Sequence, residues 1–429
     1  MQNSYGRKLN PQRRHKEPLG VKGHRKSIVI TNNPSTIDAK QTLRVNFPNL
    51  GANDVIIPGS SRLAFSISLT SDDANATLVQ NIGRAIVKRV TVKISGNEVL
   101  SLDDSNIFNT YMDLWKTSQE RDNLQYQGID TSRDRNVTKI RMGAGDAVND
   151  RVEDNAIATI YTNRFYVPLD FELLNTHAPF YQSGLGDRLE YELYFNDYSE
   201  VIRSTQAATY TIDNITLEFD QVTHAGLAKE VASQYYNMGV LYDHVLRHKT
   251  VNYFKQDTIW NVNINVPAKS MKGVLMLFKE PQTDFQHNTE TFYNPKITKV
   301  ETIIEGQPNQ LYAQGMKPHQ QWDEARKFFG VSPGSKYPCV VGEVVKDLHL
   351  SDVSLGEFLN DKYALWLDLR TSDDDKLHGT GRRIENTSEG ITLQIAKTAD
   401  GTGPIKAYIF LIMDAQLNIV DGRYNKTLY

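Results

Sequence analysis

A strand pattern that occurs twice along the chain is the strongest constraint on its fold. In the first half, RLAFSISLT (62–70) and RLEYELYF (188–195) alternate apolar with polar residues and are rich in β-branched and aromatic types. TIWNVNINV (258–266) and ITLQIAK (391–397) repeat the pattern in the second half. A period of two predicts strands of sheets that bury one face and expose the other.

The two halves match residue by residue at a nearly constant spacing, which indicates an internal duplication. The matched pairs lie 209 to 211 positions apart: Pro58 and Pro267, Ser61 and Ser270, Ile86 and Ile297, Lys88 and Lys299, Gly96 and Gly306, Tyr111 and Trp322. Further on, Leu169-Asp170 matches Leu367-Asp368 at 198 positions, because the preceding loop is longer in the first half. Each half also contains one predicted helix, at 105–116 and 319–329.

The repeat therefore predicts an all-β chain with a few inserted helices, built as two tandem eight-stranded jelly-roll sandwiches. We expect a flexible basic arm at 1–26, a first jelly roll at 27–222, a linker at 223–244 and a second jelly roll at 245–429. Periodicity alone does not separate a jelly roll from an immunoglobulin-like sandwich. Long loops and an inserted helix favour the jelly roll, which packs two antiparallel sheets face to face.

Charge separates the N-terminus from the rest of the chain. Eight basic residues oppose only Glu17 before position 27, a charge of +7 in a protein whose net charge is −3. Such a segment predicts an interaction tail for DNA phosphates or acidic lipid headgroups. A nuclear-localisation patch or a solubilising tail are the alternatives. The candidate contact residues are Arg7, Lys8, Arg13, Arg14, Lys16, Lys22, Arg25 and Lys26.

The remaining composition is that of a globular protein, with 39% hydrophobic residues to build a core. The single cysteine, Cys339, rules out a disulfide within the chain and favours folding in the cytosol or nucleus. AYIFLIM (407–413) fits one buried strand and is far shorter than a membrane span. We expect no secretory signal, because the N-terminus has no apolar segment.

One stretch, WLDLRTSDDDKLHGTGRRIE (366–385), resembles a catalytic or metal-binding sequence. Its three aspartates, Asp373 to Asp375, lack the spacing of a calcium-binding loop, and HGTG lacks the following Lys-Ser/Thr of a phosphate loop. A nucleophile elbow is also missing. We therefore predict a structural connection between two strands, in which glycines provide the turns.

Other candidate sites are weaker still. His244 and His248 lie four residues apart, but they lack the glutamate of an H-E-x-x-H motif. Cys339 is expected to be a small buried residue, and GAGD (143–146) is a lone glycine turn. The 21 tyrosines are explained by core and subunit packing. The sequence thus predicts no catalytic residue, no metal site and no cofactor.

Three stretches give the chain a family resemblance: 363–395, 409–419 (IFLIMDAQLNI) and 165–195. Together with the duplication, they resemble double-jelly-roll major capsid proteins, in particular the hexon-like proteins of Polinton/Maverick elements and adintoviruses. The likeness spans roughly 30–429. The resemblance implies a homotrimer that forms a pseudo-hexagonal capsomer of an icosahedral shell around double-stranded DNA.

The resemblance also implies partners and a location. The partners are copies of the chain itself, penton and minor capsid proteins, and genomic DNA or an internal membrane through the arm. The protein would be made in the host cytoplasm, assembled there or in the nucleus, and found in the virion. Two other functions remain open on the sequence. One is a carbohydrate-binding, adhesion, penton or spike component; the other is a jelly-roll enzyme, for which no H-x-H motif is present.

Overall fold

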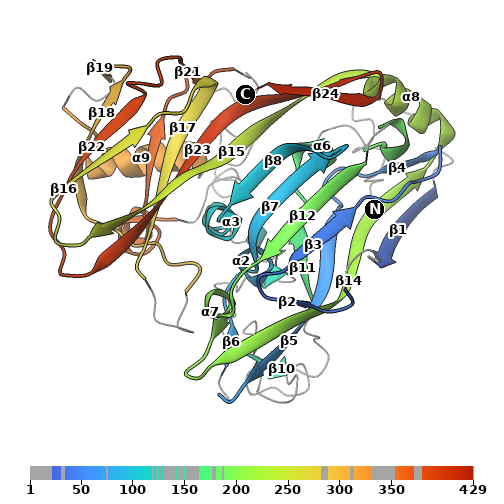
Figure 1. The fold of residues 1–429 in the computed structure, drawn as a ribbon, viewed down its shortest axis with the longest axis horizontal. Helices are drawn as coiled ribbons and strands as arrows, with labels where there is room; N and C mark the ends of the chain where they lie inside the picture. Colours follow the sequence, from blue (N-terminus) through green and yellow to red (C-terminus); the bar gives the residue numbers. More distant parts are fainter. Residues whose placement is uncertain are drawn as a thin grey trace, which may run out of the picture.

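The structure is a computed structural model of the 429-residue chain. It describes residues 22–29, 34–73, 76–117, 120–121, 124, 127–128, 141–142, 149–150, 164–175, 180–185, 188–281, 288–309, 314–329, 353–371 and 379–428. Figure 1 shows two β-sandwiches side by side, the first in blue to green and the second in yellow to red.

The first sandwich packs two antiparallel sheets around one core. One sheet has the order β1 (Lys22–Val29), β14 (Ala208–Thr223), β5 (Arg62–Ser71) and β11 (Arg164–Pro168). The other has the order β3 (Thr42–Asn46), β12 (Leu189–Phe195), β7 (Val87–Ile94) and β8 (Asn97–Asp103). Short strands extend this framework: β2 (Ile37–Asp38) and β4 (Asp54–Ile56) pair with β14, while β6 (Thr77–Leu78), β9 (Arg141–Met142), β10 (Asn149–Asp150) and β13 (Ile202–Arg203) form a separate small sheet.

The second sandwich repeats this strand order. One sheet runs β15 (Asn237–Phe254), β23 (Pro404–Val420), β17 (Ala268–Lys279) and β20 (Ala364–Asp368), with β21 (Arg382–Ile384) and β24 (Arg423–Leu428) attached. Its partner sheet runs β16 (Ile259–Ile264), β22 (Ile391–Lys397), β18 (Ile297–Ile304) and β19 (Gln307–Pro308). The matching order of eight strands in each half is that of a jelly roll used twice, which confirms the predicted fold class.

Helices occupy the insertions where the sequence predicted them. After β8 comes α3 (Ser105–Leu114), and after β19 comes α9 (Pro318–Phe329). The short α10 (Leu355–Asn360) begins with a capping box, in which Ser354 and Glu357 exchange hydrogen bonds. The other short helices in the described segments are α2 (Ile82–Ala85), α6 (Glu172–Asn175), η2 (Gln182–Gly184) and α7 (Tyr198–Val201).

Side-chain alternation explains why each sheet has an inner face. Along β12, Leu189, Tyr191, Leu193 and Phe195 are buried, while the residues between them are partly exposed. Burial of one such side chain contributes about 1.5–3 kcal/mol. Each roll has its own apolar core, but each core also contains residues from the other roll.

The predicted linker is more ordered than a connection between independent domains. It contains α8 (Ala225–Tyr235), and β15 then starts at Asn237, so the boundary predicted at 245 falls inside a strand. Val240 and Tyr242 in β15, and Leu417 in β23, pack in the core of the first roll. In Figure 1 these two strands and β24 run from the second roll towards α8. The second roll therefore contributes apolar side chains to the core of the first.

The predicted basic arm also ends earlier than expected. Residues 1–26 were expected to be flexible, but Lys22 to Val29 form β1 and pair antiparallel with Thr216 to Thr223 of β14. Within this ladder Arg25 lies opposite Asp220. The boundary was predicted from charge alone. Charge does not reveal that the edge of β14 offers free backbone groups with which residues 22–29 can pair.

Candidate functional site at the junction of the two jelly rolls

Helix α3 of the first roll inserts aromatic side chains into the core of the second. The Tyr111 ring is fully buried, with its centroid 5.0 Å from that of Phe292 and 5.7 Å from that of Phe329. Trp115, one turn later, lies 6.2 Å from Phe358 in α10. On the preceding turn Phe108 contacts Phe410 of β23 at 5.3 Å. Spacing of three and four residues places these rings on one helix face.

A buried carboxylate holds the other side of α3. The Asp113 side chain is 2% exposed, and its Oδ2 accepts hydrogen bonds from Asn81 Nδ2 at 2.9 Å and Gln127 Nε2 at 2.7 Å. Arg84 Nε lies 3.3 Å from the same oxygen, and Lys116 Nζ lies 2.6 Å from Oδ1. Asn81 caps α2 and Arg84 lies within it, whereas Gln127 lies further along the chain and Lys116 just after α3. This one carboxylate therefore ties α3 to two other segments of the first roll.

The electrostatics of this carboxylate follow from its partners. Burial alone raises the pKa of Asp113, but the positive charges of Arg84 and Lys116, with hydrogen bonds from Lys116 and Asn81, outweigh burial and lower the pKa to about 2. Arg84 also donates to Asp170 at 2.7 Å from Nη2. Asp113 is therefore charged at neutral pH, with its charge balanced inside the protein.

Polar contacts continue the junction on both sides of α3. Tyr242 in β15 donates a hydrogen bond to the Val99 carbonyl at 2.6 Å. Arg247, further along the same strand, pairs with Asp104 at 2.9 Å. Two other contacts join the loop after β17 to the first roll: Thr289 Oγ1 to the Gln80 carbonyl at 2.6 Å, and Arg121 to Glu290 at 2.9 Å.

Lys279, at the end of β17, binds the backbone of the loop that follows this strand. Its Nζ donates to the Asn288 carbonyl at 3.1 Å and the Thr289 carbonyl at 2.9 Å, and lies 4.7 Å from the centre of the Phe292 ring. Burial disfavours the ammonium form and lowers the pKa of Lys279 to about 8. The lysine thus anchors two carbonyls of the segment that contacts the first roll.

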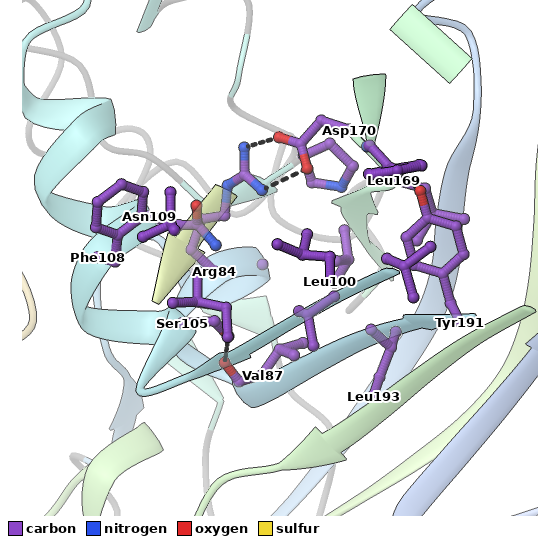
Figure 2. A pocket seen from close by; sticks show the side chains of 18 of the residues that line it. Arg84, Val87, Leu100, Ser105, Phe108, Asn109, Leu169, Asp170, Tyr191 and Leu193 are labelled. Atoms are coloured by element: carbon purple, nitrogen blue, oxygen red, sulfur yellow. Dashed lines mark hydrogen bonds and ion pairs between the residues drawn. The ribbon is translucent and has the colours of Figure 1, made fainter. Parts of the chain in front are cut away.

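A cavity of about 190 Å³ lies beside α3 (Figure 2). Its walls come from β7, β8, β11, β12, α2 and α3 of the first roll, and from Asp243 and Val245 of β15. The figure shows Leu100, Leu169, Tyr191 and Leu193 around the hollow, with the Arg84–Asp170 ion pair at one end.

The stretch that resembled a catalytic sequence joins β20 to β21. Asp373 to Asp375 and His378 lie outside the described residues, but both ends of the connection are described. Asp414 of β23 accepts hydrogen bonds from the Ser270 hydroxyl and, at 3.1 Å, from the Gly379 N–H. The Thr371 N–H donates to the Thr380 carbonyl at 2.7 Å, which closes the loop at its base.

The other sequence candidates are resolved in part. His244 and His248 lie on strand β15, not on a helix, and burial lowers the pKa of His244 to about 4. Across the described segments, no three His, Cys, Asp or Glu side chains are grouped to hold a metal ion. Cys339 and 143–146 lie outside those segments.

The structure places part of the basic arm. Lys22, Arg25 and Lys26 lie on β1, and Lys26 is exposed. The other five candidates, Arg7, Lys8, Arg13, Arg14 and Lys16, lie outside the described residues. Of the helices that the structure describes, none is long and apolar enough to cross a membrane.

Sequence reasoning identified α3 but not its role. The aromatic spacing of Phe108, Tyr111 and Trp115 was visible as an apolar helix face, which by itself is typical of packing against the nearest sheet. The pattern did not indicate that α3 packs against a sheet of the second roll. No sequence motif marked Asp113 as a buried carboxylate. Its hydrogen-bond donors lie 3 to 32 positions away, at no recognisable spacing.

The strand order defines the class: the chain is a double-jelly-roll protein. Neither a family model nor a curated protein matches its sequence. Among solved structures, it is similar to PBCV-1 VP54 fitted into the virophage Sputnik, with a TM-score of 0.60 and 11% identity over 96% of this chain and 98% of that one. The cryo-EM structure of the Sputnik virophage matches with a TM-score of 0.55 and 11% identity, over 97% of this chain and 91% of that one. The Faustovirus major capsid protein matches with a TM-score of 0.53 and 10% identity, over 95% of this chain and 92% of that one.

Proposed function

We propose that this chain is the major capsid protein of a double-stranded DNA virus or virus-like element, a structural subunit of an icosahedral shell and not an enzyme. The observation that carries the proposal is the extent of the structural likeness. Both rolls match capsid proteins together, over 95% or more of this chain. At about 11% identity this likeness concerns the fold, so the function needs its own test.

Self-association follows from the junction inside the chain. There, β8 of the first roll contacts β15, the edge strand of the second, and α3 contacts the neighbouring strand β23. Because the rolls have the same strand order, the second roll carries an equivalent surface on β19 and α9. The first roll carries the equivalent of β15 on β1. Repeating the internal contact between copies joins them head to tail, and a closed ring of three chains contains six rolls.

Strand register identifies the equivalent positions. Ile28 in β1 pairs with Leu217 of β14, and Leu246 in β15 pairs with Leu411 of β23. On its other side, Leu217 pairs with β5, and Leu411 likewise pairs with β17. These two strands occupy the same position in their rolls. Residues 22–29 therefore correspond to 240–247. This is the part of β15 that contacts the first roll.

On the opposite surface, the duplication relates His319, Trp322 and Arg326 of α9 to the three aromatic residues that α3 inserts across the internal junction. His319 is exposed, and the other two are partly exposed. This face is more polar than that of α3, which suits a contact formed after folding.

The assembly test uses light scattering and negative-stain microscopy at micromolar concentration. The expected mass is three times that of a 48.7 kDa chain, and the expected images are flat trimeric particles or shells. A double variant with His319→Asp and Arg326→Glu should yield folded monomers, whereas Lys426→Glu, on exposed β24, should leave trimers intact. A wild-type monomer under all assembly conditions would count against the capsid function.

The basic arm is proposed to face the interior of the shell. Lys22 pairs with Thr223, so the arm enters β1 at the α8 end of the roll. The long connection between β8 and β11 enters at the other end, where Arg164 pairs with Ser66. An arm and a long insertion at opposite ends suit a wall with an inner and an outer surface.

Deleting residues 1–21 tests this role while leaving β1 intact. The shortened protein should still form trimers but lose most binding to DNA or to vesicles with acidic lipids. Wild-type binding to DNA should be independent of sequence and weaken steeply with salt. Loss of trimers without any change in DNA binding would instead make the arm a strap between subunits.

Finer assignments rest on the sequence resemblance. We propose the Polinton/Maverick and adintovirus lineage, with penton and minor capsid proteins as partners and assembly in the host cytoplasm or nucleus.

The connection with Asp373 to Asp375 and His378 is proposed to be structural. Changing the aspartates to Asn should affect assembly or stability only. Tight stoichiometric metal binding that these changes abolish would refute that role. Specific glycan binding without particle assembly would favour the adhesion or spike alternative.

A further inference from the structure

The cavity beside α3 is open to solvent at its rim and has an apolar wall. Leu100 in the wall is partly exposed, and the Asp170 side chain at the rim is half-exposed. Its volume of about 190 Å³ exceeds the roughly 150 Å³ of an engineered apolar cavity that binds benzene. A molecule that fits would remove the apolar wall from water and so gain binding free energy.

The lining selects an apolar guest. Most of its side chains are aliphatic or aromatic, and they come from four strands, helix α3 and the segment after β11 of the first roll, and from Val245 of the second. Val87, Leu102, Leu169 and Leu193 are all buried. Ser105, one of the few hydroxyl groups at the wall, already donates to the Val87 carbonyl at 2.8 Å. The hydroxyl hydrogen of Ser105 is therefore already used within the wall.

The charges at the rim exclude an anion. Arg84 lies between Asp113 and Asp170, so two carboxylates already neutralise it. Asp243, also at the rim, forms an ion pair with Lys272. A ligand carboxylate would have to displace Asp170 and would face its negative charge. A neutral hydroxyl, by contrast, can reach the half-exposed Asp170 side chain and leave the ion pair in place.

We propose that this cavity is a binding site for a small neutral molecule with an apolar body, the size of one aromatic ring or a chain of about six to eight carbons. A hydroxyl group is accepted at the Arg84–Asp170 end. The wall includes both rolls, so a bound molecule adds contacts across the junction and stabilises the pair together. This inference does not depend on the capsid function, because the site lies within one chain.

The experiment measures thermal unfolding of the full-length protein with benzene, 1-hexanol or hexanoate. At about ten times its Kd, a ligand of the folded state raises the Tm by roughly 1–4 °C. Benzene and 1-hexanol should do so, and hexanoate should not. Equal shifts with hexanol and hexanoate would overturn the proposed chemistry, and no shift with any neutral probe would overturn the site.

Two variants locate the binding. Leu100→Phe fills the hollow and should abolish the shift by benzene, whereas Leu100→Ala enlarges it and should allow naphthalene to bind as well. The matched control is Leu189→Ala, a buried core residue of the same sheet that does not line the cavity. This control should lose stability but keep its benzene shift. If Leu100→Phe folds and still responds to benzene like the wild type, the molecule binds elsewhere and the proposal fails.

Discussion

Replacing Tyr111 with Ala tests the junction most directly, because this side chain belongs to one roll and is buried in the core of the other. The ring is fully buried and forms edge-on contacts with Phe292, Phe329 and Trp115, at centroid distances of 5.0, 5.7 and 6.2 Å. The substitution leaves a cavity between α3 and the second roll without changing any charge.

The expected loss follows from the volume removed. Truncation of a buried aromatic side chain to Ala costs about 3–5 kcal/mol in the free energy of unfolding. Three aromatic pairs, each contributing about 0.5–1.5 kcal/mol beyond buried area, place Tyr111→Ala in the upper part of that range. Such a loss is a large fraction of the roughly 5–15 kcal/mol that stabilises a typical domain.

Calorimetry and guanidinium titration measure both the loss and its location. We expect the single transition of the wild type to separate into two in Tyr111→Ala, because the rolls no longer unfold together. Tyr111→Phe is the matched control. It keeps the ring and removes a hydroxyl that has no hydrogen bond of normal geometry among the described residues, so its stability should stay within about 1 kcal/mol of wild type. A loss below 1 kcal/mol in Tyr111→Ala, with one transition retained, would refute the coupling.

Three further changes test other parts of the structure. Between pH 4 and 2, protonation of Asp113 should lower the free energy of unfolding by about 2 kcal/mol, because its folded pKa of about 2 lies below the ordinary 3.8. Denaturant titrations of Asp113→Asn should lack this part of the slope, and an unchanged slope contradicts the assignment. Between pH 8 and 10.5 the unfolded state binds the Lys279 proton and the folded state does not, so the wild type should gain about 3 kcal/mol relative to Lys279→Met. A difference that is flat with pH argues against a buried ammonium. Asp414→Ala removes the acceptor for Ser270 and Gly379 and should cost about 3–5 kcal/mol by chemical denaturation, whereas a cost below 1 kcal/mol would show that the loop base is held by other contacts.

Some elements were predicted within a residue or two, and others were not. The pattern over 188–195 gave a strand that the structure places at Leu189–Phe195, because strict alternation marks both faces of a half-buried strand. AYIFLIM was predicted as one buried strand of seven residues, whereas β23 extends from Pro404 to Val420. Its second half includes the polar residues Asp414 and Gln416. The Asp414 carboxylate accepts hydrogen bonds from Ser270 and Gly379, and Gln416 donates to Asn418.

The sequence by itself predicted two β domains, the duplication that relates them and the helix inserted in each. These features depend on local alternation and on a repeat, both of which can be read along the chain. Only the tertiary structure decided which roll receives Tyr111, how donors up to 32 positions away gather around Asp113, and where β1 finds its partner 187 to 201 positions away. It also decided where the cavity lies, since a void is the space that packing between distant segments leaves unfilled. The physical reason is that alternation specifies which face of a strand is buried, while the identity of the buried neighbour depends on how whole sheets and helices fit together.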